Sequence, residues 1–289
     1  MQFNMRMTAT ASAVLAFAGI LAGCNKAAPP APSSSAPASA AASGDAQIVK
    51  LASVAPMSGS QAHYGKDNAN GVQMAVDELN KQGMVIGGKK VRFEAVIEDD
   101  GADPKQGTAV AQKLCDAKVN GVVGHLNSGT TIPASKVYND CGLPMVTGAA
   151  TNPALTKPGY KTTFRIIAND NALGAALADE AKAMGLKRVA VIDDRTAYGQ
   201  GLAEVFADVA KKNGLEVVSQ QFTNDKATDF MAILTEIKAK KPDSIFYGGM
   251  DAQAAPMLRQ IEQLGMGNVK FFGGDGICTA EIYKLSGES

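Results

Sequence analysis

Apolar and polar positions along the chain follow two periods in turn, and the alternation predicts strands and helices. Residues Val91 to Ile97 alternate one by one, which is typical of a β-strand with two different faces. A stripe at helical spacing precedes them and consists of Val72, Ala75, Val76 and Leu79. Gly83 is placed to end that helix, and Asp103-Pro104 is placed to start the next one, with a capping acid before proline.

This order of strand and helix occurs twice along the chain. The first set of predicted strands is 48–55, 91–97, 121–123 and 143–146, and the second set is 188–193, 217–222 and 244–247. In the second set, helices are expected to start at Tyr198-Gly199 and within 225–229. The second of these helices carries the stripe Phe230, Ile233, Leu234 and Ile237. The pattern predicts an α/β chain of two similar lobes, each a parallel sheet with helices on both faces, and a cleft between the lobes.

Two loops of small and polar residues follow adjacent predicted strands of the first lobe. They are Leu126 to Thr131 and Thr147 to Pro153. Ser128, Thr130 and Thr131 lie where a helix begins, so their hydroxyls either cap backbone N–H groups or face a ligand. A helix start attracts anions, and loops at the carboxyl ends of parallel strands meet in one crevice. The pattern is therefore compatible with a site for a small carboxylate, and equally with ordinary helix caps.

The first 45 residues have a different composition from the rest. Residues 1–24 read as an export signal with an apolar run too short to span a bilayer, ending in Leu21-Ala-Gly-Cys24. That ending resembles a bacterial lipoprotein signal, in which Cys24 is acylated. Residues 25–45 are rich in Ala, Pro and Ser and are expected to form a tether. The first lobe is expected to span 46–167 and the second 168–289.

Charge and motifs narrow the range of functions. Lys and Arg number 28 and Asp and Glu also number 28, so there is no basic excess for nucleic acid. The two histidines, His63 and His125, have no second ligand at metal spacing and are expected to be structural. No nucleophile elbow or phosphate loop occurs, so no cofactor, metal or catalytic residue is expected. The acids at strand ends are expected to act as caps or to lie in solvated turns. They are Asp99, Asp100, Asp193 and Asp194.

Motifs spread in order over the globular part carry a family resemblance. They are Ala55-Pro-Met-Ser-Gly59 with Tyr64-Gly65, Asp99-Asp100 with Asp103-Pro-Lys-Gln106, Gly124-His125, Ser128, Pro133-Ala-Ser135, Ala149-Ala-Thr-Asn-Pro153, Asp194 with Tyr198-Gly199, Phe246-Tyr-Gly-Gly249, and Gly273-Gly-Asp-Gly276. Residues 46 to 289 thereby resemble the periplasmic leucine/isoleucine/valine-binding proteins, the substrate-binding subunits of branched-chain amino acid ABC importers. The resemblance implies a two-lobed type I periplasmic binding fold.

The resemblance also implies roles for individual residues. Ser128 matches a serine that holds the ligand carboxylate, and Ala149 matches a backbone carbonyl that faces the ligand ammonium. Thr151 matches a threonine that touches both the carboxylate and the ammonium of the ligand. Ala150, which lies between Ala149 and Thr151 in sequence, also belongs to the expected site. Tyr64 and Tyr198 match the aromatic residues that flank and close over the ligand, one from each lobe.

Two positions depart from the family pattern. Asp275 stands where a glutamate usually pairs with the ammonium, and without the family match it would read as a turn residue between glycines. Met250 replaces a tyrosine, so a flexible thioether stands where the family has an aromatic wall. The second change leaves open a binding protein for amides, urea-like or aromatic compounds. An enzyme such as an amidohydrolase would need a nucleophile or metal in the cleft.

The resemblance implies a periplasmic monomer, lipid-anchored through Cys24, that delivers an amino acid to membrane permease subunits. Members of the family continue beyond Ser289, so the chain is expected to be truncated at its C-terminus, with an incomplete first lobe and uncovered apolar surface. Cys115 and Cys141 end successive predicted helices on one sheet face. In an oxidising compartment we expect them to form a disulfide, with two free thiols as the alternative.

Overall fold

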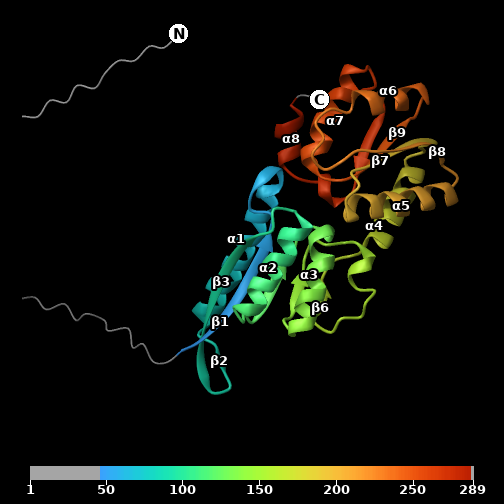
Figure 1. Cartoon of the computed structure of the whole chain (residues 1–289). Coiled ribbons are helices and arrows are strands. Elements are labelled where there is room, and N and C mark those ends of the chain that lie inside the picture. The colour runs from blue at the N-terminus through green and yellow to red at the C-terminus, as the bar shows by residue number, and fades with distance from the viewer. Residues whose placement is uncertain (1–45, 288–289) are drawn as a thin grey trace, which may run out of the picture. The chain divides into compact units, whose positions relative to one another are not determined.

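Two β-sheets organise residues 46–287, which are the part of the chain that the computed structural model describes (Figure 1). The first sheet has six strands in the order β2-β3-β1-β4-β5-β6, and the second has four in the order β10-β9-β7-β8. Every strand pair is parallel except β2 with β3. The α/β class with parallel sheets expected from the sequence is confirmed.

The first sheet is built from residues 47–165. Its strands are β1 (Gln47–Ala55), β2 (Val85–Ile86), β3 (Lys89–Asp99), β4 (Gly121–Gly124), β5 (Met145–Thr147) and β6 (Thr163–Arg165). Its helices are α1 (Ala62–Gln82), α2 (Pro104–Asp116) and α3 (Ser128–Cys141), with short 3-10 turns η1 (Gly59–Gln61) and η2 (Pro153–Leu155).

The second sheet follows a link at residues 166–169. Its strands are β7 (Arg188–Asp193), β8 (Glu216–Phe222), β9 (Ser244–Gly248) and β10 (Lys270–Gly273). The helices are α4 (Asp170–Ala183), α5 (Ala197–Lys212), α6 (Met231–Ala239), α7 (Asp251–Gln263) and α8 (Glu281–Ser286), with the 3-10 turn η3 (Asp275–Ile277).

Local signals fix several helix ends as expected. The Asp103 carboxylate accepts from the N–H groups of Lys105 and Gln106, which caps α2 before Pro104. Gly83 ends α1 with a φ of 64°, a left-handed conformation that glycine adopts without strain.

The expected start of the α6 helix within 225–229 is wrong, because α6 begins at Met231. The Asn224 side chain accepts from the N–H of Lys226, and the Asp229 side chain accepts from the N–H of Met231. Such side-chain contacts hold the backbone in turns and compete with helix formation. The polar run therefore forms the loop before the helix.

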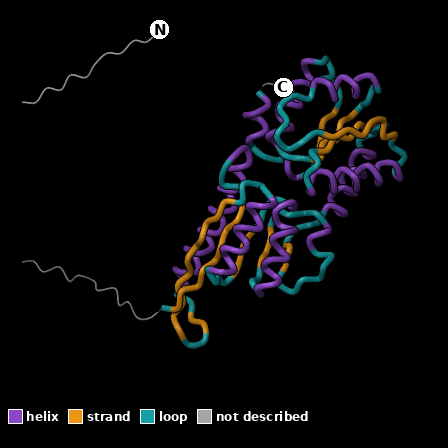
Figure 2. Tube along the Cα trace, in the orientation of Figure 1, coloured by secondary structure: helices purple, strands orange, loops and turns teal. Residues whose placement is uncertain are grey.

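Helices cover both faces of the first sheet (Figure 2). On one face, Val72 and Val76 of α1 pack with Val91 and Phe93 of β3. Ala75, expected in the same stripe, is exposed. On the other face, a larger core joins α2 and α3 to the strands, with the members Ala52, Val54, Val110, Ala111, Leu114, Val119, Val122, Ala134, Tyr138, Leu143 and Met145.

The second sheet has the same layered arrangement. Helices α4 and α5 pack on one face, where the rings of Phe206 and Phe246 stack at 3.9 Å between centroids. Helices α6 and α7 pack on the other face around Ile192, Leu234 and Ile245. The residues of β7 alternate between the two cores, so its buried run has no polar face.

Helix α1 leaves part of its face of the first sheet uncovered. A groove over β4 to β6 is lined by Leu51, Gly121, Val122, Val123, Pro144, Met145, Val146 and Phe164. Phe164 is 54% exposed and Ile166 is 76% exposed. Apolar side chains are therefore exposed on this part of the first lobe.

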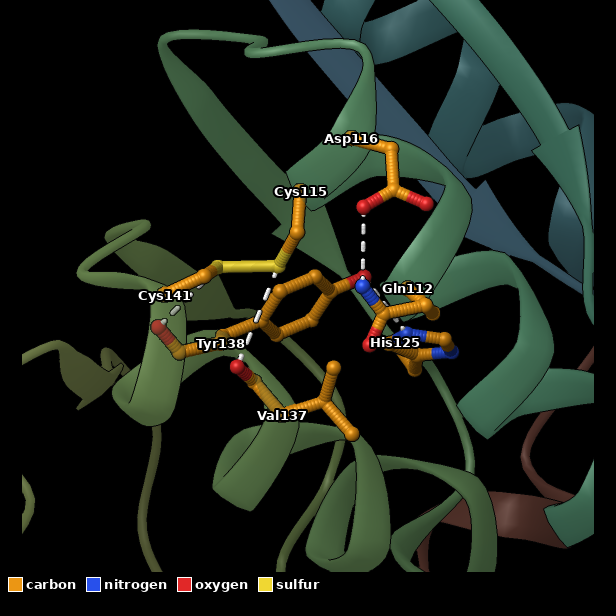
Figure 3. Close-up of a disulfide and its surroundings, with 7 residues drawn as sticks. All are labelled: Gln112, Cys115, Asp116, His125, Val137, Tyr138 and Cys141. Atoms are coloured by element: carbon orange, nitrogen blue, oxygen red, sulfur yellow. Dashed lines mark hydrogen bonds between the residues drawn. A yellow bond between two sulfur atoms is a disulfide. The ribbon is translucent and has the colours of Figure 1, made fainter.

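A disulfide joins Cys115 of α2 to Cys141 of α3, with 6.1 Å between the Cα atoms (Figure 3). It is the pairing expected from the sequence, and it fastens the carboxyl ends of two neighbouring helices. Cys278 is exposed and free. Nearby, His125 contacts Asp100 at 2.7 Å and the Tyr138 hydroxyl at 2.9 Å, with all three side chains fully buried. His125 thus has the structural role that we expected.

Candidate ligand-binding cleft

A cavity of about 210 Å³ lies between residues of the two sheets. Its lining consists of Tyr64, Leu126, Asn127, Ser128, Gly148, Ala149, Tyr198, Met250, Asp275 and Gly276. Tyr64 comes from α1 and Ser128 from the start of α3, and loops after β4 and β5 supply Leu126, Asn127, Gly148 and Ala149. The other four residues come from the second sheet's side. The volume is below the roughly 300–1,000 Å³ of pockets for drug-sized molecules, so the cavity suits a smaller ligand.

Six of the eight sequence-predicted site residues line this cavity, and Ala150 and Thr151 do not. Both are buried, because the loop after β5 turns inward beyond Ala149. The N–H of Ala150 donates to the Thr147 hydroxyl, and the Thr151 carbonyl accepts from the N–H of Asp170. Thr151 is therefore a residue behind the cavity wall in this structure.

The N-terminus of α3 forms one wall of the cavity. Ser128 is the first residue of the helix, and its hydroxyl accepts from the N–H of Asn152 at 3.1 Å. The hydroxyls of Thr130 and Thr131 instead donate to the Asn127 carbonyl. Of the three hydroxyls considered from the sequence, only that of Ser128 borders the cavity. The partial positive charge of the helix start gives this wall an affinity for anions.

An acidic group forms the facing wall. Asp275 is exposed to the cleft, and its carboxylate accepts from the Tyr198 hydroxyl at 2.8 Å. The same hydroxyl accepts from the N–H of Gly276 at 2.9 Å. Burial and the charge of Asp275 raise the pKa of Tyr198 well above its usual value, so the phenol keeps its proton and donates. No basic side chain lines the cavity, so the charge of Asp275 is available to a cation.

A second carboxylate lies buried close to this site. Asp170, the first residue of α4, is fully buried, and neither of its carboxylate oxygens has a hydrogen-bond partner among residues 46–287. Burial raises its pKa to about 6; the Thr151 hydroxyl opposes the rise, and the charge of Asp275 adds to it. Sequence reasoning missed Asp170, because an acid at a helix start is an ordinary feature.

We expect Asp170→Asn to change how stability depends on pH. The folded-state pKa lies above the usual value, so between about pH 4 and pH 6 the folded protein holds a proton that the unfolded chain releases. Wild-type stability therefore falls as pH rises through that window, and it stays lower above it. Relative to the variant, the free energy of unfolding of the wild type should fall by up to about 3 kcal/mol across that window, as measured by urea unfolding at several pH values. Parallel pH curves for the two proteins would contradict this expectation, and Asp208→Asn, on the exposed face of α5, is the control.

The four strand-end acids hold turns, as expected. Asp99 accepts from the N–H groups of Met57 and Gly101, and Asp193 accepts from that of Arg195. Asp100 and Asp194 are buried rather than solvated. Burial raises the pKa of Asp194 to about 6.

Met250 borders a second, larger cavity as well as the first. That cavity has a volume of about 430 Å³, and it shares Asn127, Tyr198 and Met250 with the smaller one. A thioether at the boundary can change rotamer more readily than an aromatic ring. The arrangement gives this position an influence on how far a ligand can extend.

Contacts between the two sides lie around the smaller cavity. The Tyr64 hydroxyl donates to the Gly276 carbonyl at 2.7 Å, and Nε2 of His63 lies 2.9 Å from the Asp251 carboxylate. The Asn152 amide donates to the Ala197 carbonyl at 2.5 Å. Sequence reasoning identified none of these pairs, because contacts over such distances leave no local pattern.

Residues 46–287 contain neither a candidate metal-ion site nor a candidate membrane-spanning helix. No group of three or more His, Cys, Asp or Glu side chains is arranged to hold a metal ion there. Over the same range, no helix is both long and apolar enough for a membrane span.

Known proteins with similar sequences are amino-acid-binding proteins. The chain is 36% identical over 245 residues to the Leu/Ile/Val/Thr-binding protein of Salmonella typhimurium, an alignment that covers 84% of this chain and 66% of that protein. It is 35% identical over 248 residues to the leucine-, isoleucine-, valine-, threonine-, and alanine-binding protein of Pseudomonas aeruginosa, covering 84% and 65%. The chain thus spans about two thirds of the length of these relatives.

Solved structures with a similar fold carry related names. A leucine-binding protein, LivK, from Thermotoga maritima superposes with a TM-score of 0.77 at 30% identity, over 83% of this chain and 67% of that one. The branched-chain amino acid transporter substrate-binding protein LivJ from Streptococcus pneumoniae, in complex with isoleucine, gives 0.75 at 30% identity, over 83% and 68%. These neighbours are two-lobed type I periplasmic binding proteins, the fold expected from the sequence.

The family comparison agrees with these relatives. Residues 48–283 match the family described as periplasmic binding protein. This is a family of transport proteins that bind substrates in the periplasm, and its members are not enzymes. On its sequence, its two sheets and its relatives, the chain belongs to the periplasmic binding protein family.

Proposed function

We propose that the protein is the substrate-binding component of an ABC importer and binds a branched-chain or related amino acid between its two lobes. The observation that carries the proposal is the pairing of opposite walls in one small cavity. A helix N-terminus with Ser128 stands on one side and Asp275 on the other. An amino acid zwitterion needs donors at its carboxylate and an acceptor at its ammonium, because both groups lose water on entry.

The remaining lining supports an aliphatic side chain between those ends. Tyr64, Leu126 and Met250 give the cavity apolar surface, and no second charged residue lines it. The relatives are named for binding leucine, isoleucine and valine. We assign Tyr64, Ser128, Ala149, Tyr198, Met250 and Asp275 to direct ligand contact. Ala150 and Thr151 join this proposed site only if the loop after β5 shifts when ligand enters.

Location and delivery complete the proposal. Cys24 lies outside the described residues, and we propose that it carries a lipid anchor, with residues 25–45 as a tether. The two lobes, 46–167 and 168–289, would act as a monomer and present the bound amino acid to permease subunits in the inner membrane. A Cys24→Ser variant that stays membrane-bound after export would contradict the anchor.

Isothermal titration with matched ligands tests the function. We expect L-leucine, L-isoleucine and L-valine to bind, and we expect two analogues of leucine to bind far more weakly. Leucinamide lacks the carboxylate, and 4-methylpentanoate lacks the ammonium, so each leaves one wall of the cavity unmatched. Tight binding of either analogue would overturn the zwitterion site. Binding of simple amides, urea-like or aromatic compounds instead of amino acids would favour the alternative, which rests on Met250 in place of a tyrosine.

A further inference from the structure

Two neighbouring residues of α1 reach across to the second lobe beside the candidate site. Nε2 of His63 lies 2.9 Å from Oδ2 of Asp251 at the start of α7. The next residue, Tyr64, donates its hydroxyl proton to the carbonyl of Gly276 at 2.7 Å. The two rings lie against each other, with their centroids 4.1 Å apart. A shift of the His63 ring would therefore also move Tyr64, which lines the cavity.

Asp251 has few other partners. Its side chain is fully buried, and Oδ2 also accepts from the Thr279 hydroxyl at 2.5 Å. Oδ1 has no hydrogen-bond partner among the described residues. A buried carboxylate with an unused acceptor depends strongly on the donors that it does have. His63 is the donor that comes from the other lobe, so separating the lobes removes it.

We propose that His63 and Asp251 form a clasp between the lobes, which positions Tyr64 and Gly276 around the ligand and tightens when His63 is protonated. The clasp adjoins the cavity on both sides. Asp251 directly follows Met250 in sequence, and Met250 lines the cavity. Gly276, which accepts a hydrogen bond from Tyr64, directly follows Asp275, another lining residue. His63 and Asp251 are thus positioning residues, since neither lines the cavity itself.

The charges that face His63 set the sign of the pH dependence. From the second lobe these are Asp251 on α7 and Glu281 on α8, whose carboxyl has a pKa lowered mainly by Lys284 and further by His63. Lys284 pairs with Glu281 at 2.6 Å. On α1 itself, Lys66 and Asp67 follow one turn later with opposite charges. Acids therefore predominate across the junction from His63.

Histidine ordinarily changes charge between pH 5 and 8. A neutral histidine has lost its charge but keeps one N–H, so deprotonation would weaken the clasp without breaking it. We expect wild-type protein to bind L-leucine about fivefold more tightly at about pH 5.5 than at about pH 8, because a hydrogen bond between two charged partners is stronger than one with a neutral donor.

Two substitutions of His63 separate the charge from the contact. His63→Gln keeps a neutral donor, so it should match the wild type at about pH 8 and lose the gain at about pH 5.5. His63→Ala should bind about tenfold more weakly than the wild type at the lower pH. At each pH, the ratio of the wild-type affinity to the affinity of His63→Gln cancels the effect of other groups that titrate in this range, including Asp170. Lys136→Gln, which removes an exposed pair with Asp140 on α3, is the matched control and should change neither affinity nor its pH dependence.

The affinity measurements rest on the proposed amino-acid binding, whereas small-angle scattering without ligand does not. We expect the radius of gyration of the wild type to increase from about pH 5.5 to about pH 8, and that of His63→Ala to be larger already at the lower pH. Asp251→Asn should behave like His63→Gln. If Asp251→Asn fails to fold, the variants of the partly exposed His63 still decide the question. If no amino acid binds, the proposed function fails, and the scattering alone tests the clasp. Equal radii for wild type and His63→Ala at both pH values would overturn it.

Discussion

Asp275→Ala should weaken the binding of L-leucine by at least about thirtyfold. Asp275 is the one charged residue in the lining of the cavity, and it faces the wall formed by the start of α3. It is exposed in this structure, but a ligand between the lobes would cover it. Removing one partner of a desolvated charge pair costs about 2–5 kcal/mol, and we take the lower end of that range because of the exposure. Titration calorimetry of the folded variant measures the effect.

Three comparisons make this test specific to the carboxylate. Asp275→Glu restores the residue usual in the family and should retain affinity within a few-fold, although its longer side chain has to share space with Tyr198. Asp208→Ala removes an exposed acid on α5 of the same lobe and should have no effect. Tyr198→Phe removes the hydroxyl that donates to Asp275, and it should give a smaller loss than Asp275→Ala. An alanine variant that binds like the wild type would mean that Asp275 is only a turn residue.

Removal of the disulfide should lower the free energy of unfolding by about 3 kcal/mol. Cys115 and Cys141 are separated by 26 residues in sequence, and closing a loop of that length restricts the unfolded chain by about this amount. The double variant Cys115→Ser with Cys141→Ser also leaves two small polar groups at the junction of α2 and α3. Urea unfolding of the oxidised wild type and the double variant measures the difference.

The third cysteine of the described region supplies the control for that experiment. Cys278 is exposed and unpaired, so Cys278→Ser should change stability by less than about 0.5 kcal/mol. Treatment with a reductant should bring the wild type close to the double variant while leaving the variant unchanged. Unfolding of the wild type and the double variant at the same urea concentration would show that the bond has little influence on stability.

Elements governed by short-range patterns could be predicted from the sequence. The strand β7 was expected at its observed bounds because a buried parallel strand is a continuous apolar run. The helix start at Asp103 followed from capping chemistry. The start of α6 was misplaced, because the capping side chains of Asn224 and Asp229 stabilise turns as readily as a helix start. A pattern of polar residues does not distinguish those two outcomes.

The candidate site could be predicted only as far as local pattern and family resemblance reach. The loop after a predicted strand gave Ser128, and the resemblance supplied Tyr64, Ala149, Tyr198, Met250 and Asp275. The cross-lobe partner of His63 could not be predicted, because Asp251 lies 188 residues away and looks like a helix-start acid. The lack of hydrogen-bond partners for the Asp170 carboxylate also could not be predicted. It depends on which residues surround the buried side chain in the folded protein, and the local sequence does not show them.

Cys278 gives the protein a practical property. It is exposed, it lies three residues after Asp275, and the other two cysteines between residues 46 and 287 are joined to each other. A maleimide fluorophore would therefore label one site in this region without any engineered cysteine. The dye would lie next to the η3 turn, where entry of the proposed ligand would alter the local polarity. If the proposed amino-acid binding holds, the natural sequence offers a starting point for an optical sensor of that ligand.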